Sequence, residues 1–581
     1  MPSRRQFLAL GAAAGAATVL PAPLAAHAAM PGAPPRAPLA PEARREDVTV
    51  EDIAHAETVL GLSFRPEQRE LMLPDVNWRR GTYETIRENE PPNHVAPLLA
   101  PDFPAPPAPR GPMHVRIPER VRMTPSEADL AFASLPELAA LLRARRVSSV
   151  ELTELFLGRL KRYDPELKVV ISLLEERAMN TARARDADLA RGLDRGPLHG
   201  IPYGAKDLLA ARGARTTWGA EPYREQVLDE DAAVVELLEA SGAVLVAKLS
   251  LGALAWGDVW FGGRTNSPWD TEEGSSGSSA GPGAAVAAGL VPFAIGSETY
   301  GSIVSPSTRN GVTGHRPTFG RVSTRGAMAL CWSLDKLGPM TRSAEDAALV
   351  FDAIRDVGTA RGDLGFPFDG ASGVQGMRVG YVPALFEGDD AGARADRATL
   401  DVLRGLGVDL VEVALPDGPE ATACMDMTVT AEAAAAFDGL TRSGEVDQLV
   451  RQERFAWPNT FRHGRLIPAV EYINAQRIRQ RLVQETEAAF GAVRAIVTPT
   501  FGGSQLALTN LTGHPAVCIP NGFFPLEAED GTPLAPEAAA RRTPHSITFL
   551  GPLYGDHAPL VLAHAVQGAT DWSRQRPPVG A

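Results

Sequence analysis

A run of sixteen small residues, GSSGSSAGPGAAVAAG from Gly274 to Gly289, constrains the fold of this chain more than any other feature. The run holds no charge and no aromatic ring, and four serines fall within five of its positions. A Gly/Ser tract is usually a flexible linker. This one continues into AAVAAGL and then into the apolar, strand-like LVPFAIGSETYGSIVSP. It therefore predicts a buried turn that opens a buried helix, where the backbone approaches other atoms closely.

Strand-like and helical segments alternate along the rest of the chain. Strands are expected in the apolar segments 167–174, 243–250, 376–383 and 495–500. Helices are expected from the amphipathic patterns in 50–62, 135–163, 396–407 and 469–490. The alternation predicts an α/β layered fold.

The N-terminus has the layout of a twin-arginine export signal. Arg4 and Arg5 precede an Ala/Gly-rich apolar region, and Ala26-His-Ala28 is a small-x-small cleavage pattern. The apolar region is too short and too rich in Gly and Ala to span a membrane comfortably, so no stable membrane insertion is expected. We predict that residues 1–28 are the signal peptide and that the mature protein, beginning near Ala29, is periplasmic or secreted.

Composition disfavours several classes of function. The net charge is −13 and no long basic tract is present, which makes a nucleic-acid partner unexpected. HExxH, paired CxxC and phosphate-loop motifs are all missing from the sequence, so we expect neither a metal nor a cofactor. The three cysteines, Cys331, Cys424 and Cys518, are too few for a disulfide framework.

Lysine is rare in this chain, because only five of the 57 basic residues counted as Lys plus Arg are lysines. Unlike arginine, lysine can lose its proton, so a retained lysine can mark a base. Lys161 and Lys168 are expected on the surface, and Lys336 lacks the partner motifs of a Ser-x-x-Lys enzyme. Lys206 and Lys248 both follow apolar segments, where burial would lower the pKa of an amine. Composition leaves both open as candidate bases.

Several motifs in order resemble the amidase signature family, from about Ala131 to Pro578. GIPYGAKD (200–207), GRTNSPWD (263–270), GSSAGPGAAVAAGL (277–290), IGSETYGSIVSPSTRNGVTGHRPTFGRVS (295–323) and LTGHPAVCIPNGF (511–523) match successive family segments. The resemblance implies an α/β amidase signature fold, with a mixed, twisted β-sheet covered by helices on both faces. It divides the chain into the signal peptide (1–28), a Pro-rich linker with an N-terminal helical extension (29–125) and a catalytic domain (126–581).

Position by position, the resemblance implies a catalytic triad of Ser302, Ser278 and Lys206. Ser302 matches the nucleophile, Ser278 the bridging serine that follows a cis peptide bond, and Lys206 the base, while Lys248 falls at a structural lysine. A serine hydroxyl needs a base at neutral pH, and a neutral buried lysine can supply it through Ser278. Ser275 and Ser276 lie outside this alignment and are expected to bond to nearby backbone.

The family's oxyanion hole consists of backbone N–H groups, which here would be those of Thr299, Tyr300, Gly301 and Ser302. Tyr300 departs from the family, which usually has glycine at this position, and so bears on the conformation of the loop. The resemblance also implies that variable segments, here within 415–480 and the insertion after Phe523, shape the substrate pocket.

The leading hypothesis is an exported amidase that hydrolyses carboxylic amide C–N bonds through an acyl-enzyme. The same fold could instead carry an esterase or aryl acylamidase, and an exported binding protein without catalysis is a third possibility. The amidotransferase component that shares this fold is disfavoured because its tRNA partner is cytosolic. The expected partner is a small-molecule amide.

Overall fold

The structure is a computed structural model that describes residues 47–89, 91, 98, 112–119, 121, 126–355, 364–525 and 541–580. The predicted signal peptide, its cleavage site and the Pro-rich linker lie outside these residues. From Val48 onward the chain forms one compact unit. Both sides of the boundary predicted between residues 125 and 126 belong to this unit. The boundary itself stays a prediction.

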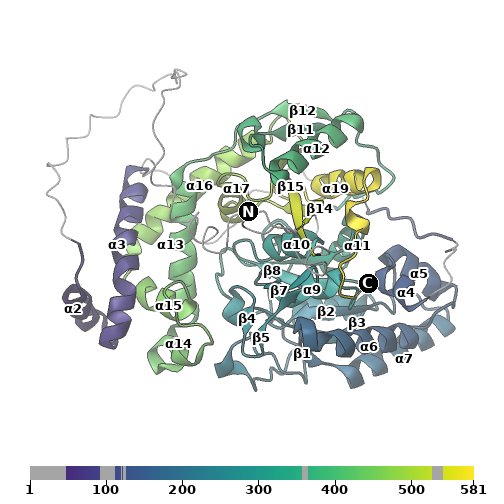
Figure 1. The fold of residues 1–581 in the computed structure, drawn as a ribbon, viewed down its shortest axis with the longest axis horizontal. Coiled ribbons are helices and arrows are strands. Elements are labelled where there is room, and N and C mark those ends of the chain that lie inside the picture. The colour runs from purple at the N-terminus through teal and green to yellow at the C-terminus, as the bar shows by residue number, and fades with distance from the viewer. Residues whose placement is uncertain are drawn as a thin grey trace. The chain divides into compact units, whose positions relative to one another are not determined.

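An eleven-stranded mixed sheet forms the centre of this unit (Figure 1). The strand order is β1-β3-β2-β8-β10-β9-β14-β15-β13-β11-β12. Strands β3, β2 and β8 run parallel, as do β13, β11 and β12, while the strands between these groups pair antiparallel. The strands of this sheet are β1 Val170–Leu173, β2 Pro202–Lys206, β3 Val244–Leu249, β8 Ala294–Glu298, β9 Thr313–Arg316, β10 Lys336–Thr341, β11 Arg378–Tyr381, β12 Asp409–Glu412, β13 Ala495–Pro499, β14 Ala516–Pro525 and β15 Arg542–Leu550.

Two small two-stranded sheets lie outside the large one. They comprise β4 Val259–Trp260 with β5 Gly263–Arg264, and β6 Asn266–Ser267 with β7 Asp270–Gly274. The second of them leads directly into the run of small residues.

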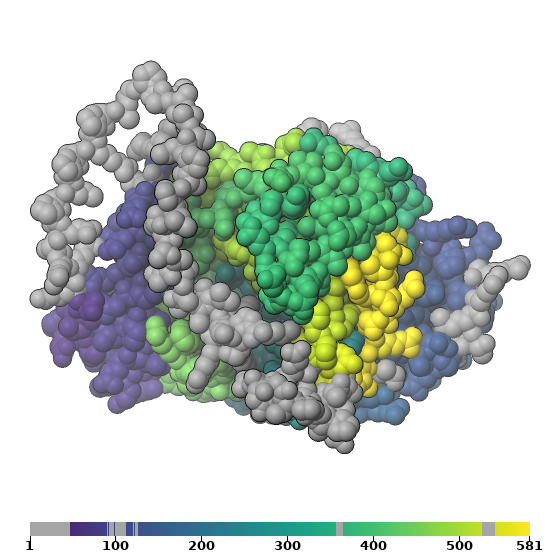
Figure 2. Space-filling view, turned by 45° about the horizontal axis from the view of Figure 1, so that its top comes forward, coloured from purple at the N-terminus to yellow at the C-terminus, as the bar shows by residue number. Residues whose placement is uncertain are grey.

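The principal helices are α2 Val50–Leu60, α3 Pro66–Glu88, α4 Glu127–Phe132, α5 Leu135–Arg143, α6 Ser149–Leu167, α7 Glu175–Ala190, α8 Ala233–Ala240, α9 Ala280–Ala287, α10 Val304–Asn310, α11 Ala344–Ile354, α12 Ala391–Gly405, α13 Pro419–Ala436, α14 Asp438–Ser443, α15 Trp457–Gly464, α16 Ala469–Ala489, α17 Gln505–Leu511 and α19 His557–Ala569. Helix α19 lies beside α12, as Figures 1 and 2 both show. No helix among the described ranges is both long enough and apolar enough to cross a membrane.

Helices cover both faces of the sheet. Neighbouring residues of β3 point to opposite faces, so Leu245 belongs to one core and Val246 to the other. The first core contains apolar residues of α5, α8, α11 and α19, and the second contains those of α9. The arrangement confirms the predicted α/β fold with a mixed sheet between helices, and each segment expected to be a strand or helix contains one.

Close packing explains why residues 274–289 are so small. The segment forms a turn followed by the buried helix α9. A Cβ added at Gly277 would lie 1.8 Å from the carbonyl oxygen of Gly257, and one at Gly281 would lie 2.5 Å from the backbone nitrogen of Ser250. No side chain fits at either position, which confirms the predicted close approach of backbone.

The N-terminal helices pack against the helical part of the unit. Ion pairs join α3 to its neighbours, including Arg79 with Asp426 of α13 and Arg87 with Glu471 of α16. Figure 1 shows α3 alongside α13 and α15. The predicted helical extension is thus part of the packed unit rather than a free arm.

Candidate active site

Lys206 is the last residue of β2, in the middle of the parallel group of strands. Its side chain is fully buried. Its Nζ lies within hydrogen-bond distance of three hydroxyl groups, at 2.8 Å from Ser278 Oγ, 2.8 Å from Ser297 Oγ and 3.0 Å from Ser279 Oγ. Among the residues that the structure describes, no carboxylate forms an ion pair with this nitrogen. The amine is therefore surrounded by hydroxyl groups rather than by a counter-ion.

Burial lowers the pKa of Lys206 well below the usual lysine value. Asp335 and Glu298 act in the opposite direction from beyond ion-pair distance, and their effect is smaller than that of burial. Desolvation of this kind favours the neutral amine, which can accept a proton from a neighbouring hydroxyl group.

Lys248 lies on the adjacent strand but in a different environment. In the parallel pairing of β2 with β3, Ala205 is opposite Lys248 and Lys206 is opposite Leu249. Because side chains alternate along a strand, Lys248 shares a face with Asp207 and not with Lys206. Its Nζ forms an ion pair of 2.8 Å with Asp207, and both side chains are fully buried. A paired ammonium group is suited to a structural role.

The remaining lysines lie elsewhere. Lys161 is half-exposed and paired with Glu175, and Lys168 is exposed, as predicted for surface residues. Lys336 is buried, and its Nζ donates to the carbonyl oxygen of Leu334. Burial, together with nearby arginines, lowers its pKa to about 7. Within the described part of the chain, the amine of Lys336 makes no hydrogen bond to Ser302.

Ser278 lies in the turn before α9, directly after a cis peptide bond between Gly277 and Ser278. The expected cis bond is thus present. Ser275 donates to the carbonyl oxygen of Ser276, as expected for a turn serine. The expectation for Ser276 was wrong, because its hydroxyl group bonds instead to the hydroxyl group of Ser305 at 2.8 Å.

Ser302 lies in the short loop between β8 and α10. Its carbonyl oxygen accepts a hydrogen bond of 3.1 Å from the backbone N–H of Ser279, which joins this loop to the turn that carries Ser278. Within the described ranges, the Ser302 hydroxyl group has no hydrogen bond to Ser278 or to any other residue. Lys206 and Ser278 are therefore in direct contact, and Ser302 is linked to them through backbone.

The loop accommodates Tyr300 without left-handed backbone at that residue. The positive φ of the loop, +90°, falls at Gly301, where a residue without Cβ is favoured. Among the residues that are described, none accepts a hydrogen bond from the backbone N–H groups of Thr299, Tyr300, Gly301 and Ser302. Successive N–H groups without acceptors can receive an anionic oxygen.

Glu298 fixes the loop between β8 and α10 by hydrogen bonds to its backbone. Its Oε2 accepts the backbone N–H groups of Ile303 at 2.9 Å and Val304 at 3.0 Å. Its Oε1 accepts hydrogen bonds from Arg316 at 2.9 Å and from Asn510 at 2.8 Å. Although burial raises the pKa of this carboxyl group, the cations and N–H donors around it lower the value to about 2. Glu298 is thus a fully bonded anion that positions the segment after Ser302.

Glu298→Gln is expected to destabilise the fold, because an amide group would place an N–H donor where every neighbour is itself a donor. Breaking one side of a buried charged network typically costs about 3–5 kcal/mol. Urea denaturation followed by circular dichroism measures the change. Glu272→Gln, at an exposed glutamate paired with Arg541, is the control and should leave the midpoint nearly unchanged. Equal midpoints for both variants would contradict this role of Glu298.

Sequence reasoning missed three residues of this site: Ser279, Ser297 and Glu298. Ser279 belongs to the four-serine run and could have been found there, since it precedes a helix. It does not cap that helix, and its hydroxyl group instead bonds to Ser297 and Lys206. Ser297 and Glu298 end a buried strand, where paired polar residues are unusual enough to serve as a signal.

The arrangement can support serine-based acyl transfer. It combines a half-buried serine beside unpaired N–H groups with a buried hydroxyl group in contact with an amine of lowered pKa. Among the described residues, no group of three His, Cys, Asp or Glu side chains could hold a metal ion.

Known proteins resemble this chain over most of its length. The family model described as Amidase matches residues 151–558, and the model of the twin-arginine translocation signal sequence matches residues 1–21. A glutamyl-tRNA(Gln) amidotransferase subunit from Azoarcus sp. (strain BH72) is 34% identical over 506 residues, covering 77% of this chain and 99% of the relative. The corresponding protein of Methylococcus capsulatus is 34% identical over 499 residues, covering 76% and 98%.

A solved structure resembles the chain to a similar extent. The native peptide amidase from Stenotrophomonas maltophilia superimposes with a TM-score of 0.65 at 27% identity. The match covers 78% of this chain and 99% of the peptide amidase.

Proposed function

The chain belongs to the amidase signature family and carries a twin-arginine export signal, and we propose that it hydrolyses carboxylic amides with Ser302, Ser278 and Lys206 as its catalytic triad. The observation that carries the assignment is the environment of Lys206. Its amine is buried, has no carboxylate partner among the described residues, and lies 2.8 Å from Ser278 Oγ. A neutral amine in such a place can serve as a base for the serines.

Acylation begins when Ser302 Oγ attacks the amide carbonyl carbon. The Ser302 proton passes to Ser278, and the Ser278 proton passes to Lys206, which becomes an ammonium group. The oxygen of the tetrahedral intermediate accepts hydrogen bonds from the N–H groups of residues 299–302. Removing one such donor typically costs on the order of 10²–10³ in rate.

The amine leaves when Lys206 returns its proton through Ser278 to the leaving nitrogen, and the C–N bond breaks. Water then attacks the acyl-enzyme and gives up a proton along the same path to Lys206. The ester bond to Ser302 breaks to release the carboxylic acid, and Lys206 returns its proton through Ser278 to Ser302 Oγ. Lys206 ends each half-reaction as a neutral amine, so the cycle consumes one water and no cofactor.

The substrate is a small-molecule amide that reaches the enzyme outside the cytoplasm. Several relatives are named as subunits of a glutamyl-tRNA(Gln) amidotransferase, but the export signal argues against the same partner for this chain. We propose a periplasmic enzyme, released from its signal peptide near Ala29, rather than one secreted into the medium.

The purified mature protein should release amine and acid from members of a panel of amides. An ester panel tested in parallel separates an amidase from an esterase, and turnover of neither class would favour the binding-protein alternative. Before purification, the cell fractions are assayed for the full-length gene product and for the double variant Arg4→Lys, Arg5→Lys. Activity should lie in the periplasm for the first and in the cytoplasm for the second. Equal distribution of the two would contradict export by this signal.

A further inference from the structure

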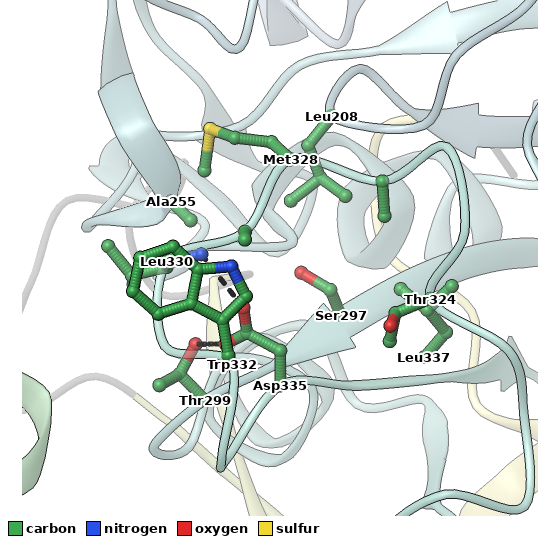
Figure 3. A pocket seen from close by; sticks show the side chains of 12 residues that line it. Leu208, Ala255, Ser297, Thr299, Thr324, Met328, Leu330, Trp332, Asp335 and Leu337 are labelled. Atoms are coloured by element: carbon green, nitrogen blue, oxygen red, sulfur yellow. Dashed lines mark hydrogen bonds between the residues drawn. The ribbon is translucent and has the colours of Figure 1, made fainter. Parts of the chain in front are cut away.

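A cavity of about 230 Å³ is lined in part by residues from the end of β8, and Figure 3 shows the side chains around it. Two of its lining residues connect it to the proposed catalytic residues. Ser297 contacts Lys206 through its hydroxyl group, and Thr299 carries the first of the unpaired N–H groups. Polar and apolar atoms contribute about equally to the surface of its wall, and the larger apolar side chains on it are Leu208, Met328, Leu330, Trp332 and Leu337. A substrate group that enters this cavity would lie within reach of the reacting atoms.

Most of this wall comes from residues 324–337, which precede and begin β10. The resemblance to the family placed the pocket within 415–480 and in the insertion after Phe523. No residue of 415–480 lines this cavity, and residues 526–540 of the insertion lie outside the described residues. The expectation that 415–480 shapes the substrate pocket therefore stays a prediction.

The one ionisable side chain that lines the cavity already has partners within the protein. It is Asp335, and each of its two oxygens accepts at least one hydrogen bond. Oδ1 accepts a hydrogen bond of 2.6 Å from Thr299, and Oδ2 accepts those of the backbone N–H groups of Leu330 at 2.8 Å and Cys331 at 3.0 Å. Burial also raises the pKa of this carboxyl group. Asp335 therefore shapes the loop and does not need a cationic ligand.

Trp332 presents a large apolar surface at this cavity, because its side chain remains 57% exposed. The backbone next to Trp332 is nevertheless fixed by hydrogen bonds of the following residue, Ser333. Ser333 donates to Glu432 through its N–H at 3.0 Å and its hydroxyl group at 2.6 Å, and its carbonyl oxygen accepts a bond of 2.8 Å from Arg479. An exposed aromatic ring on an anchored backbone is typical of a contact surface for a ligand.

We infer that this cavity binds an uncharged, apolar group of the amide substrate, at least the size of a phenyl ring, and that Trp332 packs against it. The inference rests on the proposed function and adds the substrate class to it. A cavity of about 150 Å³ already holds benzene. A charged group would lose its hydration here without gaining a partner, so the cavity selects against charge.

The group can belong to the acyl part or to the amine part of the amide, and two substrate series separate these sources. The first keeps 4-nitroaniline as the amine and varies the acyl group through acetyl, hexanoyl, phenylacetyl and succinyl. The second keeps the acetyl group and varies the amine through methylamine, hexylamine, benzylamine and a diamine. In one of the two series, kcat/KM should rise by at least about tenfold from the small to the apolar member, since each buried CH₂ contributes roughly fourfold. The kcat/KM of the charged substrate should be lower than that of the smallest substrate in the same series.

Trp332→Ala should lower kcat/KM by about tenfold for the apolar substrates and leave the smallest substrate nearly unchanged, because only the large group reaches the ring. Trp332→Phe should restore most of the loss. Trp78→Ala is the matched control: it makes the same replacement at a tryptophan that is 43% exposed on α3, and should change neither substrate class. Preference for charged substrates in both series, or equal effects of Trp332→Ala on all substrates, would overturn the inference.

A binding measurement keeps the inference distinct from the proposed function. Ser302→Ala is titrated calorimetrically with phenylacetamide, which carries the apolar group on the acyl part, with N-benzylacetamide, which carries it on the amine part, and with succinamate. At least one of the two apolar amides should bind, and more weakly when Trp332→Ala is added, while succinamate should not. Absence of binding by the apolar amides would overturn the inference even if the enzyme is active. Hydrolysis that persists in Ser302→Ala would instead contradict the proposed function.

Discussion

Ser302→Ala is expected to abolish amide hydrolysis while leaving the fold intact. Without the hydroxyl group no acyl-enzyme can form, and loss of a catalytic nucleophile typically lowers kcat by a factor on the order of 10⁴ or more. The wild type should also take up one equivalent of a fluorophosphonate probe at Ser302, and the variant should take up none. Steady-state kinetics with one amide, together with mass spectrometry of the labelled protein, measures both effects.

Ser275→Ala is the control for this experiment. Ser275 belongs to the same serine run as Ser278, but its hydroxyl group bonds only to the adjacent carbonyl oxygen of Ser276 among the described residues. Activity and labelling should therefore remain close to wild type. Labelling at Ser275 or Ser278, or continued labelling of Ser302→Ala, would show that the alignment of the serines is wrong.

Local patterns in the sequence were enough to predict some elements of the fold, whereas strands such as β9, β14 and β15 were not predicted. Apolar segments such as 243–250 and 495–500 became β3 and β13, and the amphipathic segment 469–490 became α16. The small residues before α9 predicted close packing because only glycine fits beside backbone, as Gly277 does beside Gly257. Each of these features depends on residues that are neighbours in the chain.

The choice between two buried lysines depended on geometry that composition does not contain. Both Lys206 and Lys248 follow apolar segments, and the structure buries both. They differ because strand alternation turns Asp207 toward Lys248 and leaves Lys206 among serines. The sequence alone does not show that Asp207 pairs with Lys248 and not with Lys206. That difference follows from the way β2 pairs with β3.

The cavity could not be predicted for a related reason. Its shape depends on contacts between distant segments, such as Asp335 with Thr299 and Ser333 with Glu432. Neither pair has a sequence signal, since serine, threonine and acidic residues are common on protein surfaces. The resemblance to the family indicated the proposed catalytic residues, but it did not indicate which residues line the cavity.

Lys206→Arg is expected to lower kcat/KM by a factor of roughly 10²–10⁴, the usual contribution of a general base. A guanidinium group has a pKa above about 12 and stays protonated, so it cannot accept the proton that passes through Ser278. Lys248→Arg is the control, because arginine can keep the ion pair with Asp207. Its kcat/KM should change far less. A collapse confined to Lys248→Arg, with Lys206→Arg near wild type, would reverse the assignment of the base.

The pH dependence of the wild type provides the second part of this test. Burial lowers the pKa of Lys206, so the amine is neutral above that lowered value and takes up a proton as the pH falls through it. Acylation should therefore decline on the acidic side, and kcat/KM should follow the protonation of one group. Lys206→Met removes that group and should be inactive throughout the pH range.

The free energy of unfolding should also depend on pH through the protonation of Lys206. Between the lowered pKa of folded Lys206 and its ordinary value of 10.5, the unfolded chain binds a proton that the folded chain does not. The free energy of unfolding contributed by this group therefore rises with pH across that interval. Relative to Lys206→Met, the wild type should gain thermal stability as the pH rises toward 10.5, as measured by scanning calorimetry of both proteins. A constant difference between the two melting temperatures would show that Lys206 titrates alike in both states, and could not be the neutral base that this mechanism needs.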